Sequence, residues 1–140
     1  MATVTKKRQP SAKTILKKSI KDIEAGQWCQ GDLYKERDPD TGTPYPKLHA
    51  CAVGLVAMHG LDGIQEGDKF YFDYPTEMSP EPVRTALRAL YDALPKGRKS
   101  KWRTGDFLSM RDAVIEYNDA PSTKRTRAAA WFSKALDKIS

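Results

Sequence analysis

Four side chains of this sequence could bind a metal ion or act as a nucleophile: Cys29, His49, Cys51 and His59 are its only cysteines and histidines. A structural zinc ion usually takes its four ligands from two closely spaced pairs. Only His49 and Cys51 form such a pair, and Cys51 lies in an apolar segment. We therefore expect no metal site and no cofactor, and interpret both cysteines as free thiols of a reducing compartment.

Cys51 is the best candidate for a nucleophile, because a helix that begins near it would stabilise a thiolate. His49 or His59 could serve as its base, but no acidic residue is evidently placed to orient the imidazole. The sequence also contains no Walker loop, dinucleotide fingerprint or Gly-x-Ser-x-Gly motif. We assign no catalytic residue and favour a protein that is not an enzyme, with a Cys51-dependent enzyme as the third hypothesis.

Two further polar groups have a structural interpretation. Asp38, Asp40 and Gly42 resemble part of a calcium loop, but His49 stands where its last ligand would be, so we predict a turn. Asn118, the only asparagine, and Asp119 precede an expected helix. Their side chains could accept hydrogen bonds from the free N–H groups at that helix start, with contacts from Thr126 and Arg127. This pattern is typical of an interhelical cap, and a polar pocket is the alternative.

The elements that must position these groups are mainly helical. Apolar residues recur at helical spacing in five segments, which we predict as helices over 11–25, 50–59, 79–94, 106–117 and 122–138. The second is apolar almost all round and should be central to the core, where Gly54 indicates the close approach of another element. Residues 26–49 are expected to form an irregular hairpin or loop excursion, and residues 69–74 could add one short strand. The prediction is a mostly α, single-domain bundle over 10–140, after a disordered basic tail over 1–9.

The net charge of +6 is unevenly distributed. Residues 1–22 carry seven basic groups and one acidic group, residues 96–103 carry five basic groups, and residues 120–140 carry five basic groups and one acidic group. Such segments attract nucleic acid or an acidic protein, or are simply solvated. The longest apolar run, residues 50–58, is too short to span a membrane, and no apolar segment follows the basic residues 6–8 as in a secretory signal. We expect a cytoplasmic protein that does not bind membranes.

Three short motifs follow one another along the chain: Trp28-Cys29-Gln30-Gly31, Cys51-Ala52-Val53-Gly54, and an aromatic residue followed by Asn118-Asp119. In this order they resemble the motifs of a family of small helical proteins of unknown function from actinobacteria and their phages. Tyr117 stands where the family has tryptophan, and Leu55 where it has alanine. The likeness covers about residues 12–60 and 105–139.

The resemblance implies no activity, but it implies a phage-encoded accessory protein in a bacterial cytoplasm and a cluster of motif residues around one place. These residues are Trp28, Gln30, Gly31, Cys51, Gly54, Asn118 and Asp119. Packing of Trp28 between the end of the first helix and Gly54 would be a sufficient physical reason for several of them.

The leading hypothesis is a non-enzymatic interaction module that binds a host macromolecule, most simply a protein, with its oligomeric state undetermined. Two segments outside the family-like core supply the candidates for partner binding: Phe70, Tyr71, Phe72 and Tyr74, and Arg98, Lys99, Lys101, Trp102 and Arg103. The alternative is nucleic-acid binding by residues 96–103 and the start of the last helix. There, the fourth and fifth helices could imitate a helix-turn-helix, with Lys124, Arg125 and Arg127 on the recognition helix.

Overall fold

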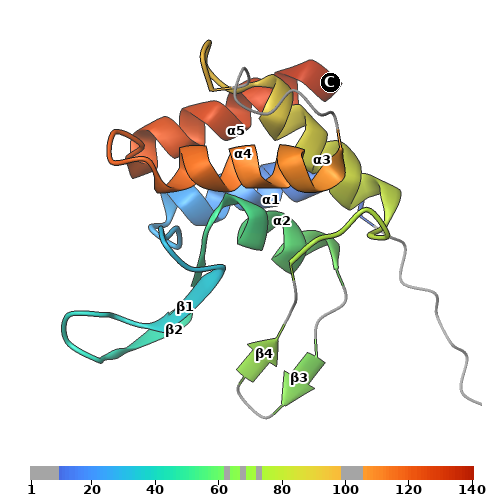
Figure 1. The fold of residues 1–140 in the computed structure, drawn as a ribbon. Coiled ribbons are helices and arrows are strands. Elements are labelled where there is room, and N and C mark those ends of the chain that lie inside the picture. The colour runs from blue at the N-terminus through green and yellow to red at the C-terminus, as the bar shows by residue number, and fades with distance from the viewer. Residues whose placement is uncertain (1–9, 62–63, 67–68, 72–73, 99–105) are drawn as a thin grey trace, which may run out of the picture.

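A computed structural model describes residues 10–61, 64–66, 69–71, 74–98 and 106–140, with only the backbone described between 64 and 71. In these ranges, five helices form the body and two antiparallel hairpins project from it (Figure 1). The helices are α1 (Ala12–Glu24), α2 (Ala52–Gly60), α3 (Glu81–Asp92), α4 (Phe107–Asp119) and α5 (Arg125–Ile139). The strands are β1 (Tyr34–Arg37), β2 (Pro44–Ala50), β3 (Ile64–Glu66) and β4 (Lys69–Tyr71). The predicted mostly α fold is confirmed.

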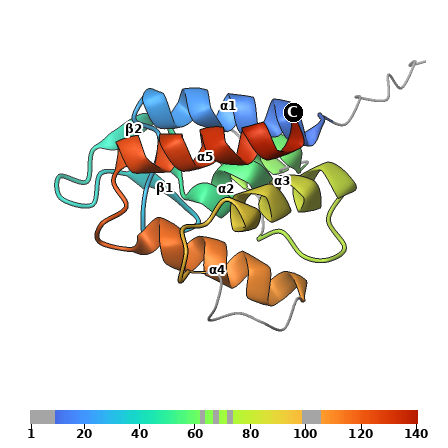
Figure 2. The ribbon, with the colours of Figure 1, turned by 90° about the horizontal axis from the view of Figure 1, so that it is seen from above.

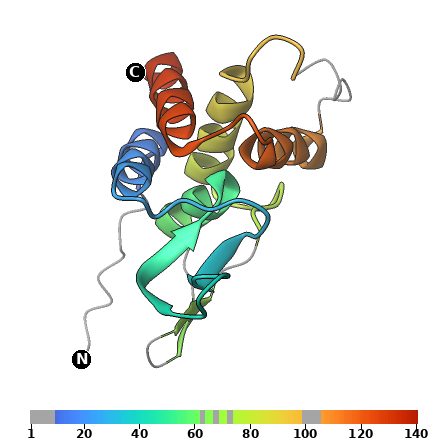
Figure 3. The same ribbon diagram turned by 90° about the vertical axis from the view of Figure 1, so that its left-hand side faces the viewer.

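Helix α2 is the apolar centre of the body, as its composition predicts. Seven of its nine residues are buried, and α1, α3 and α4 pack against it. Helix α5 packs against α1 and α3, on the side of the body away from the hairpins (Figures 1 and 2). Helices α4 and α5 diverge from the turn that joins them, with α3 between them (Figure 3). They therefore do not form the packed pair of a helix-turn-helix, and that expectation is wrong.

Local capping signals account for two of the helix starts. The side chains of Ser11 and Asp106 accept hydrogen bonds from the first turns of α1 and α4. Helix α3 begins two residues later than predicted: Pro80 is its N-cap, and the Ser79 hydroxyl accepts from the Thr76 N–H in the preceding turn. Helix α2 begins at residue 52 rather than 50, because Ala50 is still paired within β2.

Both hairpins are antiparallel. In the first, Tyr34 pairs with Ala50, and the turn is closed by Asp38, whose carboxylate accepts from the Asp40 N–H at 2.8 Å. The predicted hairpin and its turn are confirmed. In the second, β3 pairs with β4, so the single strand expected near residues 69–74 is one arm of a hairpin. None of the helices in the described ranges has the length and apolarity needed to cross a membrane.

Candidate functional site

The side chain of Asn118 joins three segments that are far apart in the sequence. Its Oδ1 accepts from the indole Nε1 of Trp28 at 2.7 Å and from the N–H of Ala52 at 2.9 Å. Its Nδ2 donates to the Cys29 carbonyl at 3.1 Å and to the Asp119 carboxylate at 2.9 Å. These are the four hydrogen bonds that an amide side chain can make. Asn118 is fully buried, so the end of α4 is fixed to the start of α2 and to the segment before β1.

Gln30 and Asp119 complete this link. The Nε2 of Gln30 donates to the carbonyls of Asn118, Ala120 and Thr123 at 2.8, 3.1 and 3.0 Å. Carbonyls at the end of a helix have no partner within it, so Gln30 acts as a side-chain cap of α4. The Asp119 carboxylate also accepts from the Gly31 N–H at 2.9 Å.

Cys51 and Gly54 lie at the other side of the same link. The Cys51 Sγ accepts from the Gly54 N–H at 3.4 Å, so Cys51 is the N-cap of α2 rather than a residue inside it. A Cβ added to Gly54 would lie 2.1 Å from the carbonyl oxygen of Leu33. The predicted close approach at Gly54 is confirmed, but the neighbour is the Leu33 backbone and not the expected Trp28.

The structure therefore brings all seven family-motif residues together. We call these seven residues the hairpin root, because they fix the base of the β1–β2 hairpin to the helices. One detail of the prediction is wrong: Asn118 accepts from the start of α2 and not from the start of α5. Thr126 and Arg127 are exposed, and the turn before α5 is held by Gln30 instead.

The two thiols are protonated in this environment. Both are free and buried. Burial raises the pKa of Cys29 to about 12 and that of Cys51 to about 11. A thiol with so high a pKa supplies little thiolate at neutral pH, so the geometry of Cys51 suits a helix cap and does not suit a nucleophile.

The described contacts of the two histidine side chains are with Asp22 and Tyr45 and not with the thiols. The His59 Nε2 is 2.5 Å from the Asp22 carboxylate, which connects α2 to α1. His49 stacks on Tyr45 with ring centroids 3.6 Å apart, and its partial burial lowers its pKa. In the described part of the chain, no three His, Cys, Asp or Glu side chains are grouped so that they could hold a metal ion.

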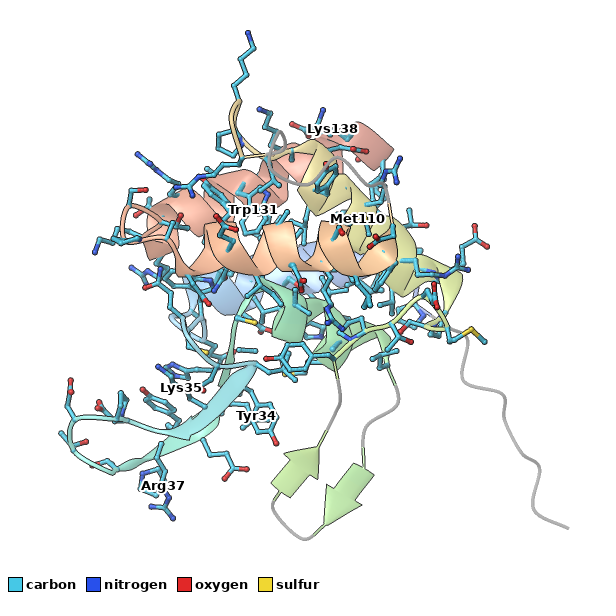
Figure 4. The ribbon with its side chains drawn as sticks, in the orientation of Figure 1. Tyr34, Lys35, Arg37, Met110, Trp131 and Lys138 are labelled. Atoms are coloured by element: carbon cyan, nitrogen blue, oxygen red, sulfur yellow. The ribbon has the colours of Figure 1, made fainter. Side chains whose placement is uncertain are left out.

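An open groove runs beside the β1–β2 hairpin. Its volume is about 590 Å³, and it lies between β2 on one side and α1 and α2 on the other. We call it the hairpin groove; it is lined by Asp22, Gln27, Glu36, Arg37, Pro44, Tyr45, Pro46, Lys47, Leu48, Met58 and His59. Arg37 lies well out along the hairpin, away from the helices (Figure 4).

The candidates for partner binding are described only in part. Tyr74 is 45% exposed, and the Arg111 guanidinium lies 5.3 Å from its ring centroid. Arg98 covers the ring of Tyr117 at 5.7 Å. The remaining side chains of these two sets, Phe70, Tyr71, Phe72, Lys99, Lys101, Trp102 and Arg103, lie outside the described residues, as does the basic tail over 1–9.

The candidates for nucleic-acid binding lie in the open. Lys124, Arg125 and Arg127 are all exposed at the start of α5, and the Arg125 Nη1 donates to the Glu24 carbonyl at 3.3 Å. Two hollows lie along this part of α5, and both include Arg127 and Ala130 in their walls.

Several features were not predicted from the sequence. The contact between His59 and Asp22 spans 37 positions, and no local pattern indicates it. Lys134 was also passed over, although it lies seven residues, or about two helical turns, after Arg127 and therefore on the same side of α5. The even spacing of Tyr45 and His49 in a strand likewise places them on one face, which could have predicted their stacking.

Residues 7–138 match a family of unknown function (DUF6197), so the chain belongs to that family. No curated protein and no solved structure matches the chain.

Proposed function

We propose that this family member is a non-enzymatic interaction module that binds a partner protein through the hairpin groove. The observation that carries the proposal is that the polar motif residues hold the hairpin in place. Their hydrogen bonds fix the base of the hairpin at the hairpin root, and this anchored hairpin forms one wall of the open groove. A groove walled by anchored elements is organised before a partner arrives, which lowers the entropic cost of binding.

The lining of the groove suits a segment of another protein. Tyr45, Leu48 and Met58 provide half-buried apolar surface, and methionine adapts to irregular partners. Arg37 and Glu36 add one charge of each sign on the hairpin side. Apolar area at the centre with polar groups around it is the usual composition of a protein interface.

The resemblance to actinobacterial and phage proteins supports a cellular setting for the module. We propose that it is encoded by a phage, acts in the cytoplasm of a bacterial cell and is directed at a host protein.

Site-specific photocrosslinking tests the proposal. A benzophenone amino acid replaces Tyr45 inside the groove or, as a matched control, Leu108, which is 51% exposed on α4. Each protein is irradiated in an actinobacterial lysate after nuclease treatment, and the adducts are identified by mass spectrometry. We expect a discrete protein adduct from position 45 that is absent from position 108.

A second variant separates groove binding from general adhesion. Met58→Asp places a charge on the groove wall and should abolish the adduct at position 45, while thermal unfolding shows that the fold is retained. Equal adducts from both positions, or an adduct that survives Met58→Asp in a folded protein, would overturn the groove as the binding site.

A further inference from the structure

A second surface, on the other side of the helical body from the hairpin groove, is strongly basic. Trp131 and Lys138 on α5 and Arg37 on the hairpin lie at opposite sides of the molecule (Figure 4). On the α5 side, three cations follow one another at helical spacing: Lys124, Arg127 and Lys134. Arg98 lies beside them, over the ring of Tyr117, which shares a hollow with Arg127 and Lys134. We call Arg98, Lys124, Arg127 and Lys134 the basic strip.

The basic strip contains two hollows, and no Asp or Glu is among the described residues that line them. One hollow, of about 280 Å³, is lined by Ala93, Pro95, Tyr117, Arg127, Ala130, Trp131 and Lys134. The next, of about 450 Å³, is lined by Ser122, Lys124, Thr126, Arg127 and Ala130. Among the ion pairs of the described residues, none involves a cation of the strip. The nearest acidic residue along α5 is Asp137, one turn beyond Lys134.

The start of α5 is also unusual in its charge. Lys124 is the N-cap and makes no capping hydrogen bond, and the first turn contains Arg125 and Arg127 but no acidic residue. The N-terminal end of a helix carries a partial positive charge, so cations there are unfavourable for the helix itself. The same cations add to the field of the helix end and make it attractive to an anion.

We propose that the basic strip binds the phosphate backbone of a nucleic acid without reading its sequence. Arginine and lysine are the side chains that neutralise phosphates, and guanidinium groups bind them through two hydrogen bonds. Arg127 and Lys134 are separated by about 10 Å along α5, which spans about two to three phosphates of a strand. The rings of Tyr117 and Trp131 are only 5% and 3% exposed, so they offer no platform for stacked bases.

An acidic protein fits this surface less well than a nucleic acid does. A protein interface requires exposed apolar or aromatic anchors at its centre. The exposed part of the two hollows provides mainly Pro95 and Ala130 between the cations. The inference concerns a different surface from the hairpin groove and does not depend on the proposed function.

Fluorescence anisotropy on the full-length protein tests the inference. The probes are 20-nucleotide single-stranded DNA, the corresponding duplex, and single-stranded RNA, each titrated at 50 mM to 300 mM salt. The strip variant is Arg98→Gln with Arg127→Gln and Lys134→Gln. The matched control is Lys13→Gln with Lys17→Gln and Lys18→Gln, which removes three exposed cations from α1.

We expect all probes to bind at low salt, with the strip variant at least tenfold weaker and the control less than threefold weaker. The slope of log Kd against log salt should fall by about 2 to 3 in the strip variant, because each lost phosphate contact removes close to one released counterion. A preference among the probes would show which strand form the surface suits.

Three results would overturn the inference. The first is no binding of any probe at 50 mM salt, and the second is an equal loss in the control variant. The third is displacement of the DNA by polyglutamate at equal charge concentration, which would show that the strip does not prefer phosphates to carboxylates. Thermal unfolding of both variants confirms that each loss is measured on folded protein.

Discussion

The hairpin root and the basic strip are both rich in polar side chains, but they use them in opposite ways. At the hairpin root, Asn118 is buried and makes the four hydrogen bonds of its amide. On the basic strip, Lys124 occupies the N-cap position of α5, but its side chain makes no capping hydrogen bond. It also takes part in none of the ion pairs of the described residues. The polar groups of the hairpin root are used in internal hydrogen bonds, whereas the cations of the basic strip are exposed and available to a ligand.

Whether a polar side chain is bonded internally or left exposed distinguishes a structural residue from a ligand-binding residue better than its residue type does. Cysteine, asparagine and aspartate are the residues that suggest chemistry in the sequence, yet at the hairpin root their atoms face backbone groups of neighbouring segments. Lysine and arginine on a helix suggest only a solvated surface. Their arrangement at a helix end that disfavours them is what indicates a ligand.

The largest effect should come from Asn118→Ala. The substitution leaves the Trp28 indole N–H, the Ala52 N–H and the Cys29 carbonyl without a partner in a buried site. Each such loss costs about 1–3 kcal/mol, so we expect the free energy of unfolding to fall by about 3–4 kcal/mol in urea titrations. Asp119→Ala, at the exposed edge of the same link, should cost about 1 kcal/mol. A loss below 1 kcal/mol for Asn118→Ala would show that the hairpin root is not a structural link.

Gly54→Ala tests the close packing of the same region. The added Cβ would meet the Leu33 carbonyl oxygen at 2.1 Å, and that oxygen also accepts from the Cys51 N–H. Backbone must move, so we expect a loss of about 2–3 kcal/mol in urea titrations. The matched control is Gly42→Ala, where φ is +71° but no atom lies within 4 Å, and only about 1 kcal/mol of backbone strain is expected. Equal losses for the two variants would contradict the contact at Gly54.

The buried thiols give the hairpin root a pH dependence. Burial raises the pKa of Cys51 from 9.0 to about 11 and that of Cys29 from 9.0 to about 12. The folded protein then holds these protons while the unfolded chain releases them, so their stabilisation is complete below pH 9 and is lost as the pH rises towards 11. Relative to a Cys29→Ala, Cys51→Ser variant, the natural protein should lose about 2 kcal/mol more between pH 8 and pH 10. Parallel pH profiles would contradict protonated, buried thiols.

The elements of the fold that the sequence predicts best are those with local causes. Ser11 and Asp106 cap the helices that follow them, and the nearly continuous apolar sequence of α2 reflects its burial on all sides. The limits of α2 were less accurate, because the pairing of Ala50 with Tyr34 competes with the helix for its first residues.

The link at Asn118 could be anticipated only as a cluster of motif residues. Its partners Ala52 and Trp28 are 66 and 90 positions away, and no periodicity encodes such contacts. Capping logic led instead to the next helix in the chain, which was wrong. The hairpin groove was missed for the same reason, since Asp22, Tyr45 and His59 meet only after the hairpin is fixed to the body.

The smallest effect has the opposite sign and distinguishes the two regions most directly. Lys124→Asp replaces an N-cap that makes no side-chain hydrogen bond with a residue that can accept from the first turn of α5 and favours the positive helix end. We expect a gain of about 1 kcal/mol in the free energy of unfolding, and weaker binding of the DNA probes. The control is Lys134→Ala, in which one cation of the strip is lost away from the helix start, so stability should stay within about 0.5 kcal/mol while DNA binding falls. If replacing Lys124 raises the stability of the protein and lowers its affinity for DNA, the role of this residue is to bind the ligand. If Lys124→Asp leaves both quantities unchanged, the start of α5 is an ordinary solvated helix end.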